Sequence, residues 1–246
     1  MSDVEARQLR YFVAVAEELH FGRAAERLGM AQPPLSRAIR TLERQLGVRL
    51  LERTTRQVTL TAAGEVLLRD ARTALDAISA AARRAQNAGQ PTPALRLALK
   101  ADDDAGLLPQ ILDAYRREEA SLPVELVLGG RGEQEPALRD GRADVALLPT
   151  PFDDRGLDVE SLLTEPRLVA LAADDPLAAR SVLRLAGLVG RTLPDGSASR
   201  TVRDLPPTTL MVAWPQASRS PAVAAFVRAA TMVAVAAPSP ATASAR

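Results

Sequence analysis

The feature that most constrains the fold is the segment FGRAAERLGMAQPPLSRAIR, residues 21–40, which predicts two short helices around a tight turn. The first helix would present a small apolar face, formed by Ala24, Ala25 and Leu28. Gly29 follows where that helix must end, because glycine adopts positive φ without steric cost. Pro33 and Pro34 then suit the first turn of a second helix, where a missing N–H costs little. Two short helices in this arrangement are typical of a helix-turn-helix.

The second helix of this pair would have one buried face and one basic face. Apolar residues recur at the spacing of a single α-helical stripe, namely Leu35, Ala38, Ile39, Leu42 and Leu46. The opposite face carries hydroxyl and guanidinium groups, namely Ser36, Arg37, Arg40, Thr41 and Arg44. A helix that presents such groups outward is suited to the DNA major groove. The alternative that the pattern leaves open is an ordinary helical pair with a solvated basic face.

The charge of the chain is unevenly distributed along the sequence. The formal net charge is only +1, from 31 basic and 30 acidic residues. Residues 1–90 contain 14 arginines against 10 acids, whereas residues 91–246 contain 17 basic residues against 20 acids. Because nucleic-acid affinity depends on local positive charge near phosphates, the N-terminal part is the candidate contact surface.

Elements on either side of the helical pair predict a winged helix-turn-helix. A helical stripe precedes the pair, namely Leu9, Phe12, Val13, Ala16 and Leu19. Residues 49–61 are rich in Thr, Val and Leu around a polar interruption at 54–57, which predicts a two-stranded wing. The residues expected to pack inward are Leu51, Val58 and Leu60. Arg53 and Arg56 would face outward and suit phosphate contacts, with a solvated turn as the alternative.

A long helix is predicted from residue 62 to about residue 88, with Thr61 as its N-cap. Apolar residues within it follow a strict 3-4-3-4-3 spacing, namely Leu68, Ala71, Leu75, Ile78, Ala82 and Ala85. That spacing is typical of a coiled-coil seam, whereas a helix packed on its own domain shows a wider stripe. The seam predicts a dimer, as a pseudo-palindromic DNA site requires. Gly89, Pro91 and Pro93 then end the helix.

From residue 94 the pattern changes to alternating strands and helices. Short β-like runs lie at 94–100, 124–128 and 143–148, with helical segments at 107–118 and 135–140 between them. This order predicts a parallel, doubly wound sheet, which binds ligands beyond the carboxyl ends of its strands. Further strands are expected at 167–172 and 209–214, followed by a helix with Ser220 as N-cap and Pro221 at its first position.

Composition argues against several classes of function. The chain has no cysteine and a single histidine, His20, for which a cap or surface role is expected. Asp102, Asp103 and Asp104 have no further ligands at a recognised spacing, so a solvated loop is expected rather than a metal site. No combination of nucleophile, base and orienting group appears, so we expect neither an enzyme nor a cofactor. Neither a signal peptide nor a membrane-spanning run is apparent, which predicts a cytoplasmic protein.

These motifs together resemble the LysR-type transcriptional regulators. The resemblance is strongest over residues 9–64, LRYFVAVAEELHFGRAAERLGMAQPPLSRAIRTLERQLGVRLLERTTRQVTLTAAG, and covers the remainder with less fidelity. It implies a bacterial protein with a winged helix-turn-helix, a dimerising linker helix and a periplasmic-binding-protein-like effector domain of two subdomains. The implied partners are double-stranded promoter DNA, a second copy in a dimer or tetramer, and RNA polymerase.

The resemblance also implies site residues. The DNA-binding positions would be Gln32, Pro33, Pro34, Ser36, Arg37, Arg40, Arg53 and Arg56. Ala31 and Gly22 depart from the family, which usually has hydroxyl residues at these positions. The candidate effector positions at strand ends are Lys100, Ala101, Asp102, Gly130 and Arg131. Arg131 could bind a small carboxylate bidentately or lie in solvent, and the sequence leaves both open.

The α/β part is shorter than the family pattern. Two segments look like family landmarks, TEPRLVALAADDPLA at 164–178 and MVAWPQASRSPAVAAFVRAA at 211–230, but only 32 residues, 179–210, lie between them. We therefore expect several tens of residues to be absent, with the join near 195–206. Because a cleft needs both lobes to enclose a ligand, weak or absent small-molecule binding is expected. Strand edges and apolar faces would also be left open.

The fold class expected is therefore α/β, with a winged helix-turn-helix, a long linker helix and a truncated periplasmic-binding-protein-like, doubly wound domain. The expected parts are a DNA-binding domain at 1–61, a dimerising helix at 62–88, a hinge at 89–93, a shortened effector-binding-like domain at 94–236 and a disordered tail at 237–246. The expected function is DNA-binding transcription regulation with an impaired or altered effector response. Two alternatives are an interaction protein that pairs with full-length relatives through the linker helix, and a small-molecule binding module.

Overall fold

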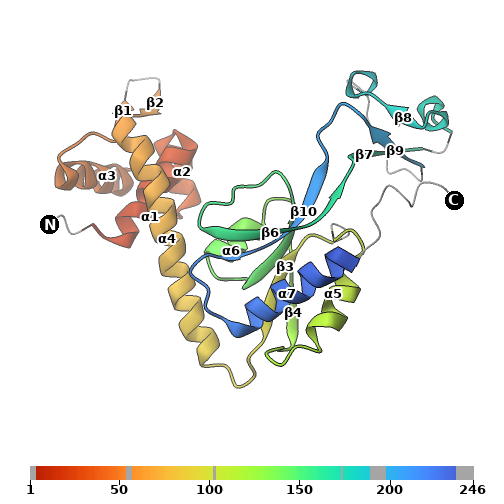
Figure 1. The fold of residues 1–246 in the computed structure, drawn as a ribbon. Helices are drawn as coiled ribbons and strands as arrows, with labels where there is room; N and C mark the ends of the chain where they lie inside the picture. The colour runs from red at the N-terminus through yellow and green to blue at the C-terminus, as the bar shows by residue number, and fades with distance from the viewer. Residues whose placement is uncertain (1–3, 54–56, 102–103, 173, 189–197, 237–246) are drawn as a thin grey trace. The chain divides into compact units, whose positions relative to one another are not determined.

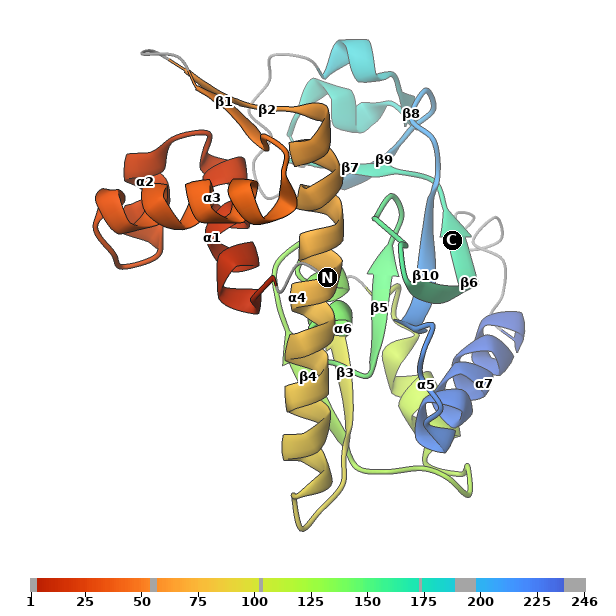
Figure 2. The ribbon, with the colours of Figure 1, turned by 90° about the vertical axis from the view of Figure 1, so that its left-hand side faces the viewer.

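The structure is a computed structural model that describes residues 4–53, 57–101, 104–172, 174–188 and 198–236. Arg56, Asp102, Asp103, part of the expected join and the expected tail lie outside the described residues. The chain divides into two compact units (Figures 1 and 2): residues 1–89 with 139–141, and residues 90–138 with 142–246.

The first unit has the predicted order of a winged helix-turn-helix. Its elements are α1 (Ala6–Glu18), α2 (Phe21–Arg27), α3 (Gln32–Leu46), β1 (Leu51–Arg53), β2 (Val58–Leu60) and α4 (Ala62–Ala88). The strands β1 and β2 pair antiparallel, with Leu51 opposite Leu60. Figure 2 shows α3 and this two-stranded wing within the unit. The predictions of the helical pair, the wing and the long helix are confirmed by these elements.

Local signals explain where these helices begin and end. Gly29 after α2 and Gly47 after α3 have φ of +64° and +71°, the left-handed conformation that glycine adopts most easily. The His20 ring accepts the Arg23 N–H at 3.2 Å and so caps α2. The Thr61 hydroxyl accepts the Gly64 N–H at 3.0 Å and caps α4. The N-cap of α3 is Ala31, which has no side-chain oxygen to contribute.

One apolar core joins the elements of this unit. Its buried members include Phe12 and Val15 of α1, Ala24 and Ala25 of α2, and Leu35, Ile39 and Leu42 of α3. Three residues of α4 pack against it, namely Ala63, Leu67 and Leu68. Leu19 was expected in the stripe of α1, but it lies beyond the end of that helix with φ of 47° and is 45% exposed. The left-handed backbone at Leu19 ends α1 and turns its side chain out of the core.

Glu43 of α3 anchors the start of the wing. Its Oε1 accepts the backbone N–H groups of Leu50 and Leu51, at 3.0 and 3.2 Å. The side chains of Leu50 and Leu51 are buried, with exposed fractions of 1% and 3%. One carboxylate therefore satisfies two backbone donors that the short strand β1 does not pair.

The second unit contains a five-stranded sheet in the order β4-β3-β5-β10-β6. Its strands are β3 (Leu95–Leu99), β4 (Val124–Leu128), β5 (Val145–Pro149), β6 (Leu157–Glu165) and β10 (Thr208–Pro215). The strand β3 is parallel to β4 and β5, as predicted, but β10 is antiparallel to both β5 and β6. The prediction of parallel strands is therefore confirmed for β3, β4 and β5, and β10 adds an antiparallel strand between β5 and β6. Antiparallel neighbours need no helical crossover between them.

Helices cover both faces of this sheet, as in a doubly wound fold. α5 (Leu108–Tyr115) and α7 (Pro221–Ala236) lie on one face, with Leu95, Leu97 and Leu99 pointing toward them. α6 (Gln134–Arg139) lies on the other face, against Ala98. This alternation along β3 follows from the period of two in a strand.

The shortened segment contributes strands to a second, three-stranded sheet. Its strands are β7 (Leu168–Leu171), β8 (Val182–Leu183) and β9 (Ala198–Val202), in the order β7-β9-β8, with short 3-10 helices at Pro176–Ala179 and Leu185–Gly187. Among the described residues, those buried in its core are Val169, Leu171, Ala178, Leu183, Leu188 and Val202. The Arg167 guanidinium donates to the carbonyls of Pro206 and Thr150, at 3.2 and 3.3 Å, where the chain passes between the two sheets.

The anchoring of the wing predicts a difference between two substitutions at Glu43. Glu43→Ala leaves the N–H groups of Leu50 and Leu51 without their acceptor and should lower the free energy of unfolding by about 1–3 kcal/mol. Glu43→Gln keeps an acceptor oxygen and should lower it by less than about 1 kcal/mol. Urea unfolding of both variants measures these losses, and equal losses would contradict the proposed anchor.

Candidate nucleic-acid interface

The outward face of α3 carries the residues predicted to contact DNA. Leu35, Ile39 and Leu42 are fully buried beneath the helix. On the other side, Gln32, Pro33, Arg37 and Arg40 are exposed, and Pro34 and Ser36 are partly exposed. The arrangement therefore presents polar and basic groups from the first three turns of the helix.

The two central arginines of this face have no acidic partner in the described part of the chain. Among the residues that the structure describes, no ion pair involves Arg37 or Arg40. By contrast, Arg44 donates to the Thr41 hydroxyl at 3.2 Å, which holds its guanidinium along the helix. The charges of Arg37 and Arg40 are thus free to meet phosphates or base edges.

The structure describes some of the residues of the wing. Leu51 is buried, and Val58 and Leu60 pack against the core, as predicted. Arg53 is the last residue of β1 and pairs with Val58 through the strand register. The side chain of Arg53 and the whole of Arg56 lie outside the description, so their roles stay predictions.

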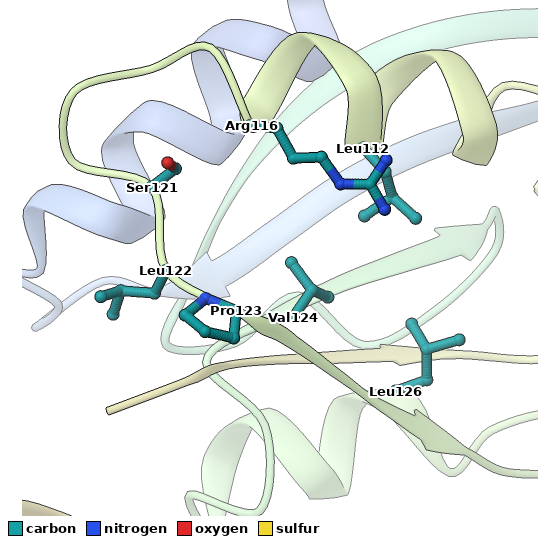
Figure 3. Close-up of a pocket in the computed structure, with 7 residues that line it drawn as sticks. All are labelled: Leu112, Arg116, Ser121, Leu122, Pro123, Val124 and Leu126. Atoms are coloured by element: carbon teal, nitrogen blue, oxygen red, sulfur yellow. The ribbon is translucent and has the colours of Figure 1, made fainter. Parts of the chain in front are cut away.

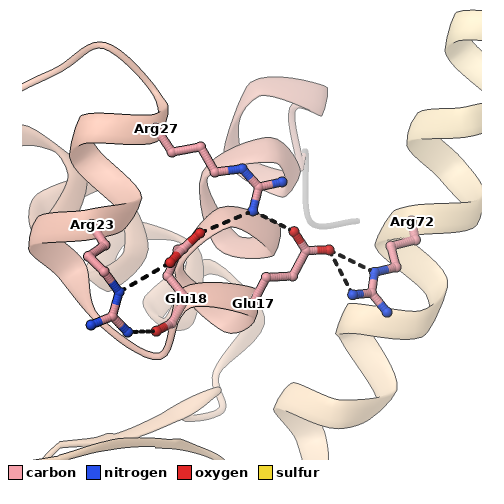
Figure 4. A network of polar contacts seen from close by, with 5 residues as sticks. All are labelled: Glu17, Glu18, Arg23, Arg27 and Arg72. Carbon is pink, nitrogen blue, oxygen red and sulfur yellow. Dashed lines mark hydrogen bonds and ion pairs between the residues drawn. The ribbon is translucent and has the colours of Figure 1, made fainter. Parts of the chain in front are cut away.

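A network of five charged residues joins α1, α2 and α4 (Figure 4). Glu17 Oε1 accepts two N–H groups of Arg72, from Nε at 3.1 Å and from Nη2 at 2.7 Å. Glu17 Oε2 accepts from Arg27 Nη1 at 2.7 Å, and Arg23 Nε donates to Glu18 Oε2 at 3.2 Å. Burial raises the pKa of Glu17, but the hydrogen bonds and charges of Arg72 and Arg27 outweigh this effect and leave the pKa below its usual value.

Sequence reasoning missed both Glu17 and Glu43. Glu17 and Arg72 are 55 residues apart, so neither spacing nor periodicity brings them together. The available signal was weak: Glu17 and Glu18 are the last two residues of α1, where the helix macrodipole disfavours acids. Two acids at that position suggest a basic partner elsewhere in the fold.

The expected dimerisation residues differ in exposure. Leu68 packs against the core of its own unit, and Ala71 is 1% exposed. Farther along α4, Leu75 is half-buried, Ile78 is 45% exposed, and Ala82 and Ala85 are exposed. Among the expected dimerisation residues, those with the most exposed apolar surface thus lie in the second half of the helix.

The candidate effector residues lie at the carboxyl ends of neighbouring strands. Lys100 and Ala101 follow β3, and Gly130 and Arg131 follow its parallel neighbour β4. The Gly130 N–H donates to Glu133 Oε2 at 2.7 Å, and Lys100 Nζ donates to the Ala101 carbonyl at 3.3 Å. The structure thus brings these residues to one edge of the sheet.

A small cavity lies at this edge. It has a volume of about 150 Å³ and is lined by Arg131, Gly132, Gln134, Glu135, Leu148, Pro149, Pro151 and Phe152. Sites for small ligands usually have volumes of about 300–1,000 Å³. Glu135 is 9% exposed, and its Oε2 has no hydrogen-bond partner within the described part of the chain. A carboxylate at this position opposes the binding of an anion.

A larger groove lies elsewhere, between α5 and the edge strand β4 (Figure 3). Its volume is about 390 Å³, and its lining is Leu112, Arg116, Ser121, Leu122, Pro123, Val124 and Leu126. Leu126 and Leu128 of β4 are 47% and 63% exposed. Arg116 is paired with Asp113 at 2.7 Å. None of the candidate effector residues lines this groove.

Two negative findings limit the chemistry of the described residues. They contain no group of three or more His, Asp or Glu that could hold a metal ion. None of the helices they form is both long enough and apolar enough to cross a membrane.

Comparison with known proteins agrees with this architecture. The family model described as "Bacterial regulatory helix-turn-helix protein, lysR family" matches residues 6–65, and the model "LysR substrate binding domain" matches residues 88–204. The solved structure of CbnR, a LysR family transcriptional regulator, aligns with a TM-score of 0.53 at 22% identity, covering 94% of this chain and 99% of CbnR. That similarity supports the fold.

Curated relatives are regulators by name. The chain is 38% identical over 186 residues to the HTH-type transcriptional regulator AlsR of Bacillus subtilis, which covers 75% of this chain and 62% of AlsR. It is 41% identical over 187 residues to the Hca operon transcriptional activator HcaR of Escherichia coli, covering 76% of this chain and 63% of HcaR. The chain therefore spans less than two thirds of the length of AlsR and HcaR.

A third relative is matched over nearly its whole length. The chain is 39% identical over 173 residues to a "Probable hydrogen peroxide-inducible genes activator" of Mycobacterium xenopi, covering 70% of this chain and 92% of that protein. Together with the two matching models, this identity shows that the chain belongs to the LysR family.

Proposed function

We propose that this protein is a sequence-specific DNA-binding transcription regulator. The observation that carries the proposal is the outward face of α3, where Arg37 and Arg40 are exposed above a fully buried apolar stripe. The names of AlsR and HcaR support regulation over the two alternatives, an interaction protein and a small-molecule binding module. Its place of action would be the cytoplasm of a bacterium, on promoter DNA, with RNA polymerase as a further partner. We propose no enzymatic activity for it.

The residues of this face would divide into two roles. Ser36 and Arg37 lie in the first turns of α3, the part of a recognition helix that approaches base edges. Arg37 would donate bidentately to a guanine, the commonest base-specific contact of arginine. Arg40, Arg53 and Arg56 would contact phosphates, and Gln32, Pro33 and Pro34 would lie close to the groove.

The protein would act as a dimer or tetramer through α4. That helix has 27 residues and is therefore about 40 Å long. Leu75, Ile78, Ala82 and Ala85 follow the seam spacing and retain exposed apolar surface. A symmetric pair of such helices would present two copies of α3 to a two-fold symmetric DNA site.

Small-molecule control would be weak or absent. Within the described residues, the three-stranded sheet formed around the shortened segment has a core of six buried apolar side chains. The cavity at Arg131 is about 150 Å³ in volume and includes the buried Glu135. Lys100, Ala101, Gly130 and Arg131 would therefore bind a small carboxylate poorly.

Two arginine substitutions separate base reading from phosphate contact. A specific duplex is first selected from a random library with the full chain. Arg37→Ala should weaken binding to that duplex by about 1–3 kcal/mol and leave binding to random DNA nearly unchanged. Arg40→Ala should weaken both equally and reduce the slope of log affinity against log salt by about one. The exposed Arg117→Ala serves as control, and equal losses for Arg37→Ala on both DNAs would contradict its base-reading role.

A second measurement tests the effector proposal. Calorimetric titration of the full chain with acetate and benzoate should give no binding in the micromolar range. The reason is that a small cavity with a buried carboxylate cannot enclose and neutralise an anion. A micromolar dissociation constant that is lost in Arg131→Ala would overturn this proposal.

A further inference from the structure

We propose that the ion pair between Glu17 and Arg72, called the joint below, fixes the angle between the helix-turn-helix (α1 to α3) and the linker helix α4. This angle would in turn set the half-site spacing of the DNA target. This inference rests on the proposed function. Glu17 and Arg72 do not lie on the DNA-reading helix, so they act as positioning residues.

The first argument is the place of Arg72 on α4. Ala63, Leu67 and Leu68 pack against the core of the helix-turn-helix, and Ala71 is buried. Arg72 follows directly, and beyond it Thr73 is exposed and Leu75 and Ile78 retain exposed surface. Arg72 is thus at the last turn by which α4 is held against α1, where a contact has the greatest effect on the helix direction.

The second argument is the geometry of the Glu17 carboxylate (Figure 4). One oxygen accepts both Arg72 N–H groups, at 2.7 and 3.1 Å, and the other accepts Arg27 at 2.7 Å. The carboxylate is therefore held between α4 on one side and α2 on the other. Charge-assisted hydrogen bonds to partners on both sides have preferred directions and therefore restrict rotation of α4 more than apolar contacts do.

The third argument is that the local sequence disfavours this placement of charge. Glu17 and Glu18 are at the negative end of the α1 macrodipole, and the last turn of α1 contains no basic residue. Arg23, Arg27 and Arg72 offset that cost from two other helices. The Glu17 side chain is 25% exposed and the Arg27 and Arg72 side chains are 50% and 48% exposed, so these ion pairs lie at the surface and should weaken as salt increases.

A small rotation of α4 at the joint would cause a large displacement of the recognition helices relative to each other at the DNA. The helix continues for 16 residues beyond Arg72 to Ala88, a length of about 24 Å. A rotation of about 10° at Arg72 would move the far end of α4 by about 4 Å, which exceeds the rise of about 3.4 Å per base pair. In a symmetric dimer the two recognition helices would shift relative to each other by a similar amount. Removing the joint should therefore weaken the preference of the dimer for one half-site spacing.

The first experiment measures spacing preference with the full chain. The selected duplex is lengthened or shortened at its centre in single base-pair steps, and a single half-site duplex is included. The wild type should lose about tenfold in affinity for each one-base-pair change, since simultaneous binding of two sites depends on geometry. Arg72→Ala should bind the parent duplex about fivefold more weakly, lose less than about threefold on a spacing change, and bind the half-site as the wild type does.

Matched variants separate positioning from stability and from direct DNA contact. Arg69→Ala removes an exposed arginine less than one turn earlier on α4 and should keep the wild-type spacing profile. Arg72→Lys keeps a positive donor and should restore most of the spacing preference. An unchanged profile in Arg72→Ala, or an equal loss on the half-site, would overturn the inference.

A second experiment needs no DNA. Because the chain lacks cysteine, spin labels can be placed at Arg44→Cys on α3 and Arg84→Cys on α4, with excess unlabelled chain to isolate distances within one protomer. The distance distribution should be narrow, and adding Arg72→Ala or Glu17→Gln should broaden it. Distance distributions of equal width in the wild type and the variants would overturn the inference, whether or not the protein binds DNA. Broader distributions in the variants, in a protein that binds no DNA, would support the joint and contradict only the proposed function.

Discussion

The burial of Leu35, Ile39 and Leu42 beneath α3 is the interaction on which the rest of the N-terminal unit depends. All three side chains are fully buried, and burial of such side chains contributes about 1.5–3 kcal/mol each. Turning α3 by one residue, about 100°, would expose part of this stripe and bury Ser36 or Arg40 in its place. The apolar side of the helix therefore fixes which residues face outward, and the outward residues are those suited to DNA.

The same core extends into α4, so DNA recognition and the proposed dimerisation would be mechanically linked. The first turns of α4 pack on the helix-turn-helix, and the ion pairs of Glu17 fix the last turn that touches it. The exposed second half of α4 is then available for a second copy. A single helix would thus take part in two interfaces, one within the protomer and one proposed between protomers.

The parts of the structure that sequence could predict depend on local signals. The order of α1 to α4, the turn at Gly29 and the cap at Thr61 follow from helical period, glycine and capping residues. The parallel pairing of β3 with β4 and β5 follows from their alternation with helices. The antiparallel pairing of β10 and the contact of Glu17 with Arg72 depend on residues far apart in the chain, which no local pattern reports. The contact of Glu43 with the N–H groups of Leu50 and Leu51 spans only seven and eight residues, but it joins a helix to a strand and follows neither periodicity. The roles of the wing arginines and of the effector residues were expected from the strand pattern and from the family resemblance, and they remain proposals.

The central claim is that Ser36 and Arg37 face the major groove of DNA twice per dimer. Its most direct test uses Ser36→Cys in this cysteine-free chain, with an iron chelate attached that cleaves nearby DNA by hydroxyl radicals. On the selected duplex the account predicts two clusters of cuts, separated by about ten base pairs or a multiple of that distance. Cleavage no stronger than that from the same chelate at Arg117→Cys would contradict it.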